Sequence, residues 1–379
     1  MMTYARARLW LGITGVGSLV VLSTLAILLK APQALLGDSN RFGFTGTFQL
    51  ATVVGLLAIW LMPFDFIGGY LLPRKFNRSD RTFASWFGGY LKAAIMHSAL
   101  YVLGGFFILL LSQQFGFSGG LAAVSTGILV CFVIRNRMVL SRESKLASAD
   151  KLLDAIALIQ SWEIFVPKTV VVDHEDVGFT GGIIGLGRNT KIVIPRGWLR
   201  FTRQQLAVAI ARRAVAINSG SYTRGLLVAF VWNAAGFMIC ATIPGAGLSS
   251  VAGFVMTACA FTLWSFIGLL ILPTISRNAS LIIDEDLVRR GMPTELIAAA
   301  AESMDQMQDG EPHRSRLIET IFHPVPNVTS RNRKPTSQIG AWNAARTTLF
   351  FSWACLGALS RSVHCNVGRP ELWTMLPTD

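Results

Sequence analysis

Two adjacent arginines, Arg212 and Arg213, stand in the middle of a predicted helix and are the first candidates for chemistry in this chain. A guanidinium stays protonated and has no lone pair to donate, so it can bind an anion but cannot ligate a metal. If Arg212 points inward it needs a carboxylate partner, because an unpaired buried charge is costly. Asp284, Glu285 and Asp286 are the candidate carboxylates. The competing interpretation is that both arginines lie on a solvated helix face.

The helix that carries these arginines has clear start and stop signals. Thr202 is a good N-cap, and Gln205 three residues later completes a capping-box pattern. Apolar residues then recur at helical spacing, at Leu206, Ile210, Ala214 and Ile217. The pair Ser219-Gly220 ends the helix.

The composition indicates a membrane protein. The 379 residues are 52% hydrophobic and only 15% charged, and the mean hydropathy is +0.50. The formal net charge is +13. In a membrane protein such an excess normally faces anionic lipids on the cytoplasmic side, so we expect lipid contacts and no nucleic-acid partner. The five cysteines show no CxxC spacing, which indicates neither a disulfide framework nor a cysteine zinc site.

Long apolar runs predict six membrane-spanning helices. They are residues 9–29, 49–72, 93–111, 119–134, 226–243 and 251–275. The run 347–359 is short, and it is either a seventh span or an interfacial helix. This pattern divides the chain into a four-span region (1–135), a polar segment (136–224), a two-span hairpin (225–275), a second polar segment (276–346) and a C-terminal tail (347–379).

The basic residues predict the orientation of these spans. Lys and Arg gather at the N-terminus, in the 74–92 loop and in both polar segments, whereas the loops on the other side are nearly free of them. The positive-inside rule therefore places the N-terminus and both polar segments in the cytoplasm. We expect the two polar segments to fold together into one small α/β domain, at what we expect to be a bacterial inner membrane. The predicted fold class is an α-helical multi-span integral membrane protein with that domain.

Two ionisable residues, Asp65 and His97, lie inside predicted spans. Such residues are functional candidates because burying them in lipid is costly. They belong to consecutive predicted spans, so we expect the two side chains to approach each other. The alternative is that each lies near the cytoplasmic end of its span and reaches water.

The strand, turn and helix around Arg212 resemble the active-site region of the HtpX-like and CAAX-prenyl-protease-like membrane zinc metallopeptidases. Residues that match the frame of their HExxH helix are Thr202, Leu206, Ala211 and Gly220. Residues that match the landmarks further along are Ser276, Arg277, Asp284, Gly291, Pro293, Leu296, His323 and Pro324. The resemblance places Asp284 beside the position of Arg212, so it implies an Arg212–Asp284 ion pair, with Arg213 the less favoured arginine and Glu285 and Asp286 the alternative partners. The resemblance covers roughly Leu146 to Asn327 and the surrounding spans, and it implies a strand at Lys191, Ile192, Val193 and Ile194 whose free edge binds an extended peptide.

The residues that would carry the family's chemistry are absent from these positions. Arg212 and Ala216 stand where the resemblance places two histidine ligands, Arg213 where it places the catalytic Glu, and Ser280 where it places the third ligand. The resemblance therefore implies a degenerate member of the family that has no catalytic residues, no metal and no cofactor. We expect it to act as a scaffold, an accessory subunit or a client-binding regulator among other membrane proteins. The alternative is a zinc-dependent membrane endopeptidase with non-standard ligands.

Overall fold

The computed structural model describes residues 2–37, 43–144, 149–174, 176, 178–307, 318–319, 323–331 and 333–373. The chain forms two compact units. The first, which we call the membrane unit, comprises Met1–Val133, Phe230–Gly268 and Thr348–Thr374. The second, which we call the polar unit, includes Ile134–Ala229 and Leu269–Thr347 and therefore contains nearly all of both predicted polar segments.

Five helices in the described part of the chain are long and apolar enough to cross a membrane. They are α1 (Tyr4–Leu28), α3 (Phe44–Phe66, extended through η1, Ile67–Leu71, and α4, Leu72–Lys75), α5 (Phe83–Leu140), α8 (Ser221–Cys240) and α9 (Val251–Arg289). The short helix α2 (Ala31–Leu36) follows α1. Large apolar side chains such as Leu28, Phe44 and Ile59 are exposed on these helices, as a lipid-facing surface requires.

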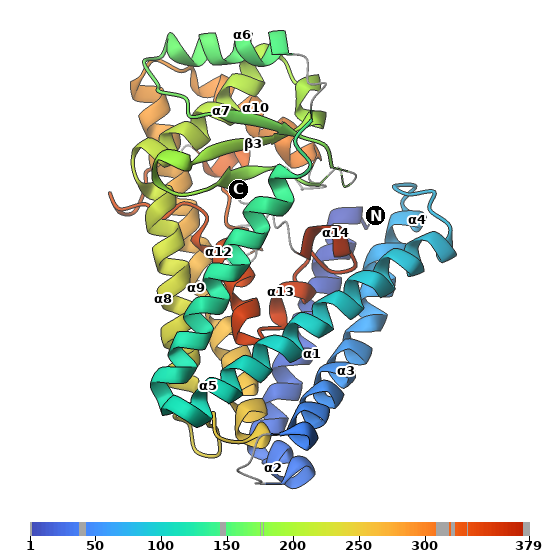
Figure 1. Ribbon diagram of the computed structural model, residues 1–379. Helices are drawn as coiled ribbons and strands as arrows, with labels where there is room; N and C mark the ends of the chain where they lie inside the picture. Colours follow the sequence, from blue (N-terminus) through green and yellow to red (C-terminus); the bar gives the residue numbers. More distant parts are fainter. Residues whose placement is uncertain are drawn as a thin grey trace. The chain divides into compact units, whose positions relative to one another are not determined.

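The predicted third and fourth spans both lie within α5, which consists of two helices joined across a kink. Within α5 the backbone leaves the helical conformation at Gly116, with φ 59° and ψ −143°. A methyl group added at Gly119 would collide with the carbonyl of Leu111, which means that the chain doubles back at this point. Figure 1 shows α5 as two arms that meet in a sharp turn. Glycine permits this positive φ, and the single polar loop expected there is reduced to a bend.

The apolar run 347–359 does not form a helix of spanning length. It is divided among α12 (Ala344–Phe351), η5 (Ser352–Cys355) and the start of α13 (Leu359–Ser362), and α14 (Pro370–Trp373) follows. From residue 348 onward the segment belongs to the membrane unit, and most of its side chains are buried there. These buried side chains include several polar ones, Ser352, Ser360, Arg361, Ser362 and Asn366. The run is therefore an internal segment of the membrane unit rather than a lipid-facing span.

The sheet of the polar unit has three strands in the order β1-β3-β2. Strand β1 (Thr169–Val172) is parallel to β3 (Lys191–Pro195), and β2 (Gly182–Ile184) is antiparallel to it. The prediction that Lys191, Ile192, Val193 and Ile194 form an edge strand is therefore wrong, because β3 is paired on both sides. The glycine-rich sequence around Gly181 predicts a turn, but in the structure it leads into β2, which pairs with the second side of β3. Gly181, with φ +74°, directs that stretch back along Val193 at a distance that excludes a side chain.

Helices cover this sheet and enclose the core of the polar unit. The central helix is α7 (Arg203–Asn218), which packs against β3, α6 (Ala149–Gln160) and α10 (Thr294–Met307). In Figure 1 these three helices lie on the same side of β3. Every residue of α7 from Leu206 to Ala216 is buried, so the helix is enclosed rather than amphipathic. Short 3-10 turns complete the polar unit: η2 (Gly187–Asn189), η3 (Arg196–Arg200) and η4 (Val328–Ser330).

Candidate functional site: a buried ion cluster on α7 and α9

Helix α7 begins as its sequence predicts. The backbone N–H of Gln205 donates to Thr202 Oγ1 at 3.2 Å, and the backbone N–H of Thr202 donates to Gln205 Oε1 at 3.1 Å. This reciprocal capping box is confirmed, and it fixes the first turn of α7. The helix ends at Asn218, and Gly220, two residues later, has φ +71°. The positions of Arg212, Arg213 and Ala216 along the helix are thus set at both ends.

The structure brings Arg212 and Asp284 together. Nε of Arg212 donates to Oδ1 of Asp284 at 2.7 Å, which joins α7 to α9. Both side chains are buried, with 6% and 7% of their side-chain surface exposed. The alternative partners, Glu285 and Asp286, instead form i,i+4 pairs with Arg289 and Arg290 on the exposed side of α9. The predicted pair is therefore the one that forms, and the solvated-face interpretation is wrong for Arg212.

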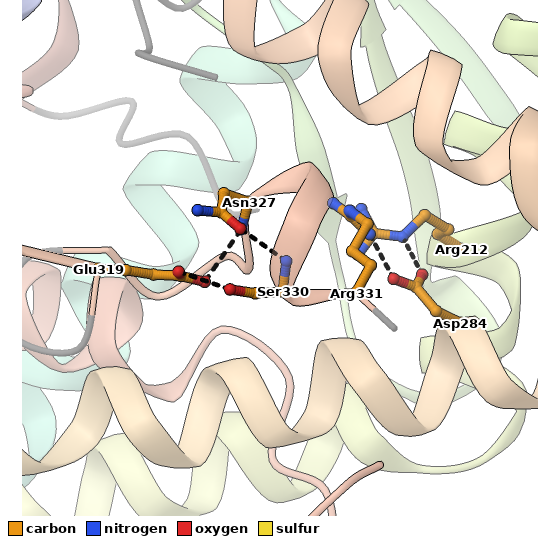
Figure 2. Close-up of polar contacts among 6 residues, drawn as sticks. All are labelled: Arg212, Asp284, Glu319, Asn327, Ser330 and Arg331. Carbon is orange, nitrogen blue, oxygen red and sulfur yellow. Dashed lines mark hydrogen bonds and ion pairs between the residues drawn. The ribbon is translucent and has the colours of Figure 1, made fainter. Parts of the chain in front are cut away.

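A second guanidinium, that of Arg331, binds the same carboxylate. Nη1 of Arg331 donates to Oδ2 of Asp284, so each oxygen of Asp284 receives a different arginine (Figure 2). Burial lowers the pKa of Arg331, and the neighbouring charge of Arg212 lowers it further, while Asp284 and Asp305 act in the opposite direction. The cluster is an Arg–Asp–Arg triad in which two cations share one anion.

Arg331 is placed by a small polar network, which Figure 2 shows beside the triad. The buried carboxylate of Glu319 accepts from the backbone N–H of Asn327 at 3.0 Å and from Ser330 Oγ at 2.7 Å. Asn327 Oδ1 accepts the Ser330 N–H at 2.7 Å and so caps η4. Sequence reasoning missed Arg331. No local pattern links Arg331 to Asp284, which lies 47 residues earlier.

Arg213 lies on another face of α7 and forms hydrogen bonds with the sheet region. Its Nη1 donates to the carbonyl of Val193 at 2.7 Å, and its Nη2 donates to that of Thr180 at 2.6 Å. The guanidinium lies 4.5 Å from the ring centroid of Trp198, a cation–π contact. Only 1% of Arg213 is exposed, and burial together with the charge of Arg212 lowers its pKa. Arg213, at the position where the resemblance places the catalytic Glu, thus ties α7 to the sheet region.

The positions that would hold zinc do not fit a zinc ion. Zinc in proteins is bound by Cys, His, Asp or Glu side chains, whereas these positions hold Arg212, Ala216 and Ser280, all of them buried. Among the described residues, no group of three or more His, Cys, Asp or Glu side chains could hold a metal ion. Two guanidiniums on Asp284 would also repel a divalent cation. No catalytic step through zinc follows from these residues.

The remaining positions that match the family serve structural contacts. Nη1 of Arg277 donates to the carbonyls of Glu319 and His323, at 2.6 and 3.0 Å, and its Nη2 donates to Thr274 Oγ1 at 2.9 Å. Arg277 therefore anchors to α9 the segment that leads to Arg331. The carbonyl of His323, rather than its ring, is the acceptor in this contact.

In the membrane unit, Asp65 and His97 do not pair directly in the described structure. Oδ2 of Asp65 accepts from Nε and Nη2 of Arg361, at 3.0 and 2.6 Å, and Oδ1 accepts from the backbone N–H of Gly368 at 2.9 Å. The ring of His97 instead contacts Tyr101, Trp353 and Trp373. Trp373 also lies 4.1 Å beneath the guanidinium of Arg361, so both residues border one cluster.

Both side chains contact the internal C-terminal segment, Asp65 through Arg361 and His97 through Trp353 and Trp373, and the expected approach of Asp65 and His97 to each other stays a prediction. Both side chains are buried, Asp65 at 1% exposed and His97 at 5%, so neither is a residue that simply reaches water. Arg361 is the partner that sequence reasoning missed. It lies 296 residues from Asp65, and no local pattern signals such a contact.

No family model and no curated protein matches the sequence. The structure, however, matches the crystal structure of S. mikatae Ste24p with a TM-score of 0.66. The match has 13% sequence identity and covers 86% of each chain. The chain has a Ste24-like fold. At this identity the match establishes the fold alone, and it agrees with the fold class expected from the sequence.

Proposed function

We propose that this protein is a catalytically silent, Ste24-like membrane protein that acts as a non-enzymatic scaffold or accessory subunit of a membrane complex. The observation that carries the proposal is the Arg212–Asp284–Arg331 triad. Arg212, a member of the triad, stands where the resemblance places a metal ligand, and the neighbouring Arg213 stands where it places the catalytic Glu. Loss of all four groups at once removes the activity, because each alone is severely damaging when lost.

The triad gives the site a structural role in place of a catalytic one. Arg212 joins α7 to α9, and Arg331 joins η4 to the same carboxylate. Arg213 joins α7 to the sheet region through two carbonyls. Together these cations hold the polar unit in one arrangement, which suits a protein whose surface must present a constant shape to partners.

Strand addition is a weaker candidate for client binding than the sequence suggested. Both sides of β3 are paired. Residues 142–144 lie along β1: the N–H of Ser144 donates to the carbonyl of Val171 at 2.8 Å, and the N–H of Asp173 donates to the carbonyl of Arg142 at 3.0 Å. Two carbonyls in and beside β2, those of Ile183 and Gly185, accept from the Tyr222 hydroxyl. A regulator that holds clients would therefore use another surface, and the scaffold role is the one we favour.

We also propose how the chain is oriented in the membrane and which side of it contacts anionic lipids. Both polar segments and the N-terminus carry the Lys and Arg excess, so we place the polar unit on the cytoplasmic side, beside anionic lipids. A bacterial inner membrane is the compartment that we propose.

The proposal can be tested by gentle purification of the full chain. Co-purifying proteins are then identified, and the metal content of the same sample is measured. We expect stable membrane-protein partners that survive a change of detergent, and no peptidase activity that a chelator removes. Chelator-sensitive cleavage of a peptide by the purified chain would instead support a zinc endopeptidase with non-standard ligands. A vesicle-binding assay with and without anionic lipid tests the lipid surface separately.

A further inference from the structure

The triad around Asp284 has more cationic than anionic groups in direct contact. Arg212 and Arg331 share the single carboxylate of Asp284. Asp305, on α10, attracts Arg331 through space and is itself partly exposed. A guanidinium does not lose its proton in a protein, so the surplus positive charge must be balanced by another anion or carried at a cost.

Three N–H groups of this cluster are buried and have no acceptor among the described residues. They are Nη2 of Arg212, Nε of Arg331 and Nε1 of Trp342. The indole of Trp342 belongs to the same cluster, because its ring centroid lies 5.4 Å from Cζ of Arg212. A buried donor without an acceptor costs about 1–3 kcal/mol, and more when it is charged. The cluster thus offers two charged donors and one neutral donor for a further acceptor.

We propose that the Arg212–Arg331–Trp342 cluster is a binding site for a carboxylate anion. A planar carboxylate matches the geometry of guanidinium N–H groups better than a spherical ion does. Its negative charge opposes the surplus of Arg212 and Arg331 over Asp284, a surplus that Asp305 offsets only through space. Two sources share this chemistry: a small free carboxylate and the C-terminal carboxylate of a peptide. A position at which the resembling peptidases hold a cation has thereby become a site for an anion.

The donors of the cluster are held in place by the surrounding structure. Arg212 lies within the enclosed helix α7, and Trp342 is fixed by its backbone N–H, which donates to the carbonyl of Ser221 at 3.0 Å. Arg331 follows the short turn η4, which is held by the Asn327 cap. A ligand would therefore meet donors that are already positioned, which lowers the entropic cost of binding.

Ligand-dependent thermal unfolding of the detergent-purified full chain tests the site. A ligand that binds only the folded state raises the unfolding midpoint with its concentration, even when binding is weak. The probes are sodium acetate, with sodium chloride and sodium phosphate at equal ionic strength, and a short peptide with a free C-terminal carboxylate, with the same peptide as its amide. We expect a saturable rise with acetate. If the peptide acid raises the unfolding midpoint more than acetate and more than the amide, the ligand is a peptide C-terminus. If acetate raises the midpoint more than the peptide acid, the ligand is a small carboxylate.

Three variants locate the site. Arg331→Lys keeps the charge but removes the Nε donor, and we expect the apparent affinity for the carboxylate to fall about tenfold. Trp342→Phe keeps an aromatic ring beside Arg212 but removes its N–H, and we expect a loss of about threefold to tenfold. Arg289→Lys changes an exposed arginine on α9 and should leave the affinity unchanged. Absence of a saturable rise, an equal rise in parent and Arg331→Lys, or a stronger response to chloride or phosphate would each overturn the proposal.

Discussion

Arg212 and Asp284, 72 residues apart in the sequence, meet at 2.7 Å in the interior of the polar unit. The contact joins the enclosed helix α7 to the long helix α9. The guanidinium of Arg212 lies at the position where the resemblance places a ligand of the metal ion. In the function that we propose, this contact holds the two helices together without a metal.

Replacing Arg212 with Ala should destabilise the polar unit markedly. Breaking a buried ion pair from one side typically costs about 3–5 kcal/mol. Because Asp284 keeps Arg331 as a partner, we expect a value near the lower end of that range. Tryptophan fluorescence during chemical denaturation, or hydrogen exchange of the α7 amides, measures the loss.

The matched control for Arg212 is Arg289→Ala, which breaks an exposed pair on α9 whose arginine side chain is 64% exposed. Exposed pairs contribute less than about 1 kcal/mol, so the control should stay close to the parent. Equal, small effects of the two substitutions would show that the Arg212 pair does not hold the unit together.

The Asp65–Arg361 pair should behave as a coupled unit inside the membrane unit. Arg361→Met leaves the buried carboxylate of Asp65 without its cation and should lower the unfolding midpoint strongly. Adding Asp65→Leu to that variant removes the uncompensated charge and should restore much of the loss, because a buried pair replaced by apolar residues is often neutral. A double-mutant cycle of midpoints in detergent measures the coupling, and additive effects of the two substitutions would contradict the pair.

A close backbone approach at Gly225 yields a third prediction. A methyl group there would collide with the carbonyl of Trp342, so Gly225→Ala should push the Trp342 segment away from α8 and lower the unfolding midpoint. Gly17→Ala, on α1, meets nothing within 4 Å and should be neutral or slightly stabilising, since alanine favours helix. An unchanged midpoint for Gly225→Ala would show that this approach is not tight.

The orientation can be tested with a reporter protein fused after Asn189, in the polar unit. The Lys and Arg excess predicts a cytoplasmic signal. A fusion within residues 244–250, between α8 and α9, serves as the control and should report the opposite side. A periplasmic or extracellular signal from the Asn189 fusion would overturn the predicted topology.

Local patterns in the sequence anticipated much of the fold. The capping box at Thr202, the boundaries of α7 and the apolar helices follow from short-range chemistry and composition. The Arg212–Asp284 contact could be inferred because the resemblance places both residues at one site. Other features depend on contacts that no local pattern encodes: the central position of β3 depends on a three-residue strand, β2, and Arg361 reaches Asp65 from the far end of the chain. Arg331 was missed because it lies 47 residues from Asp284 and no local pattern connects the two.

The zinc content of the purified full chain tests the central claim most directly, because the claim is that arginines have replaced the metal at α7. We predict well under about 0.1 equivalent of tightly bound zinc after dialysis, since Arg212, Ala216 and Ser280 offer no suitable ligands. The quadruple variant Arg212→His, Arg213→Glu, Ala216→His and Ser280→Glu should bind zinc more tightly than the parent. About one equivalent of zinc in the parent, lost on substitution of residues in α7, would contradict the account.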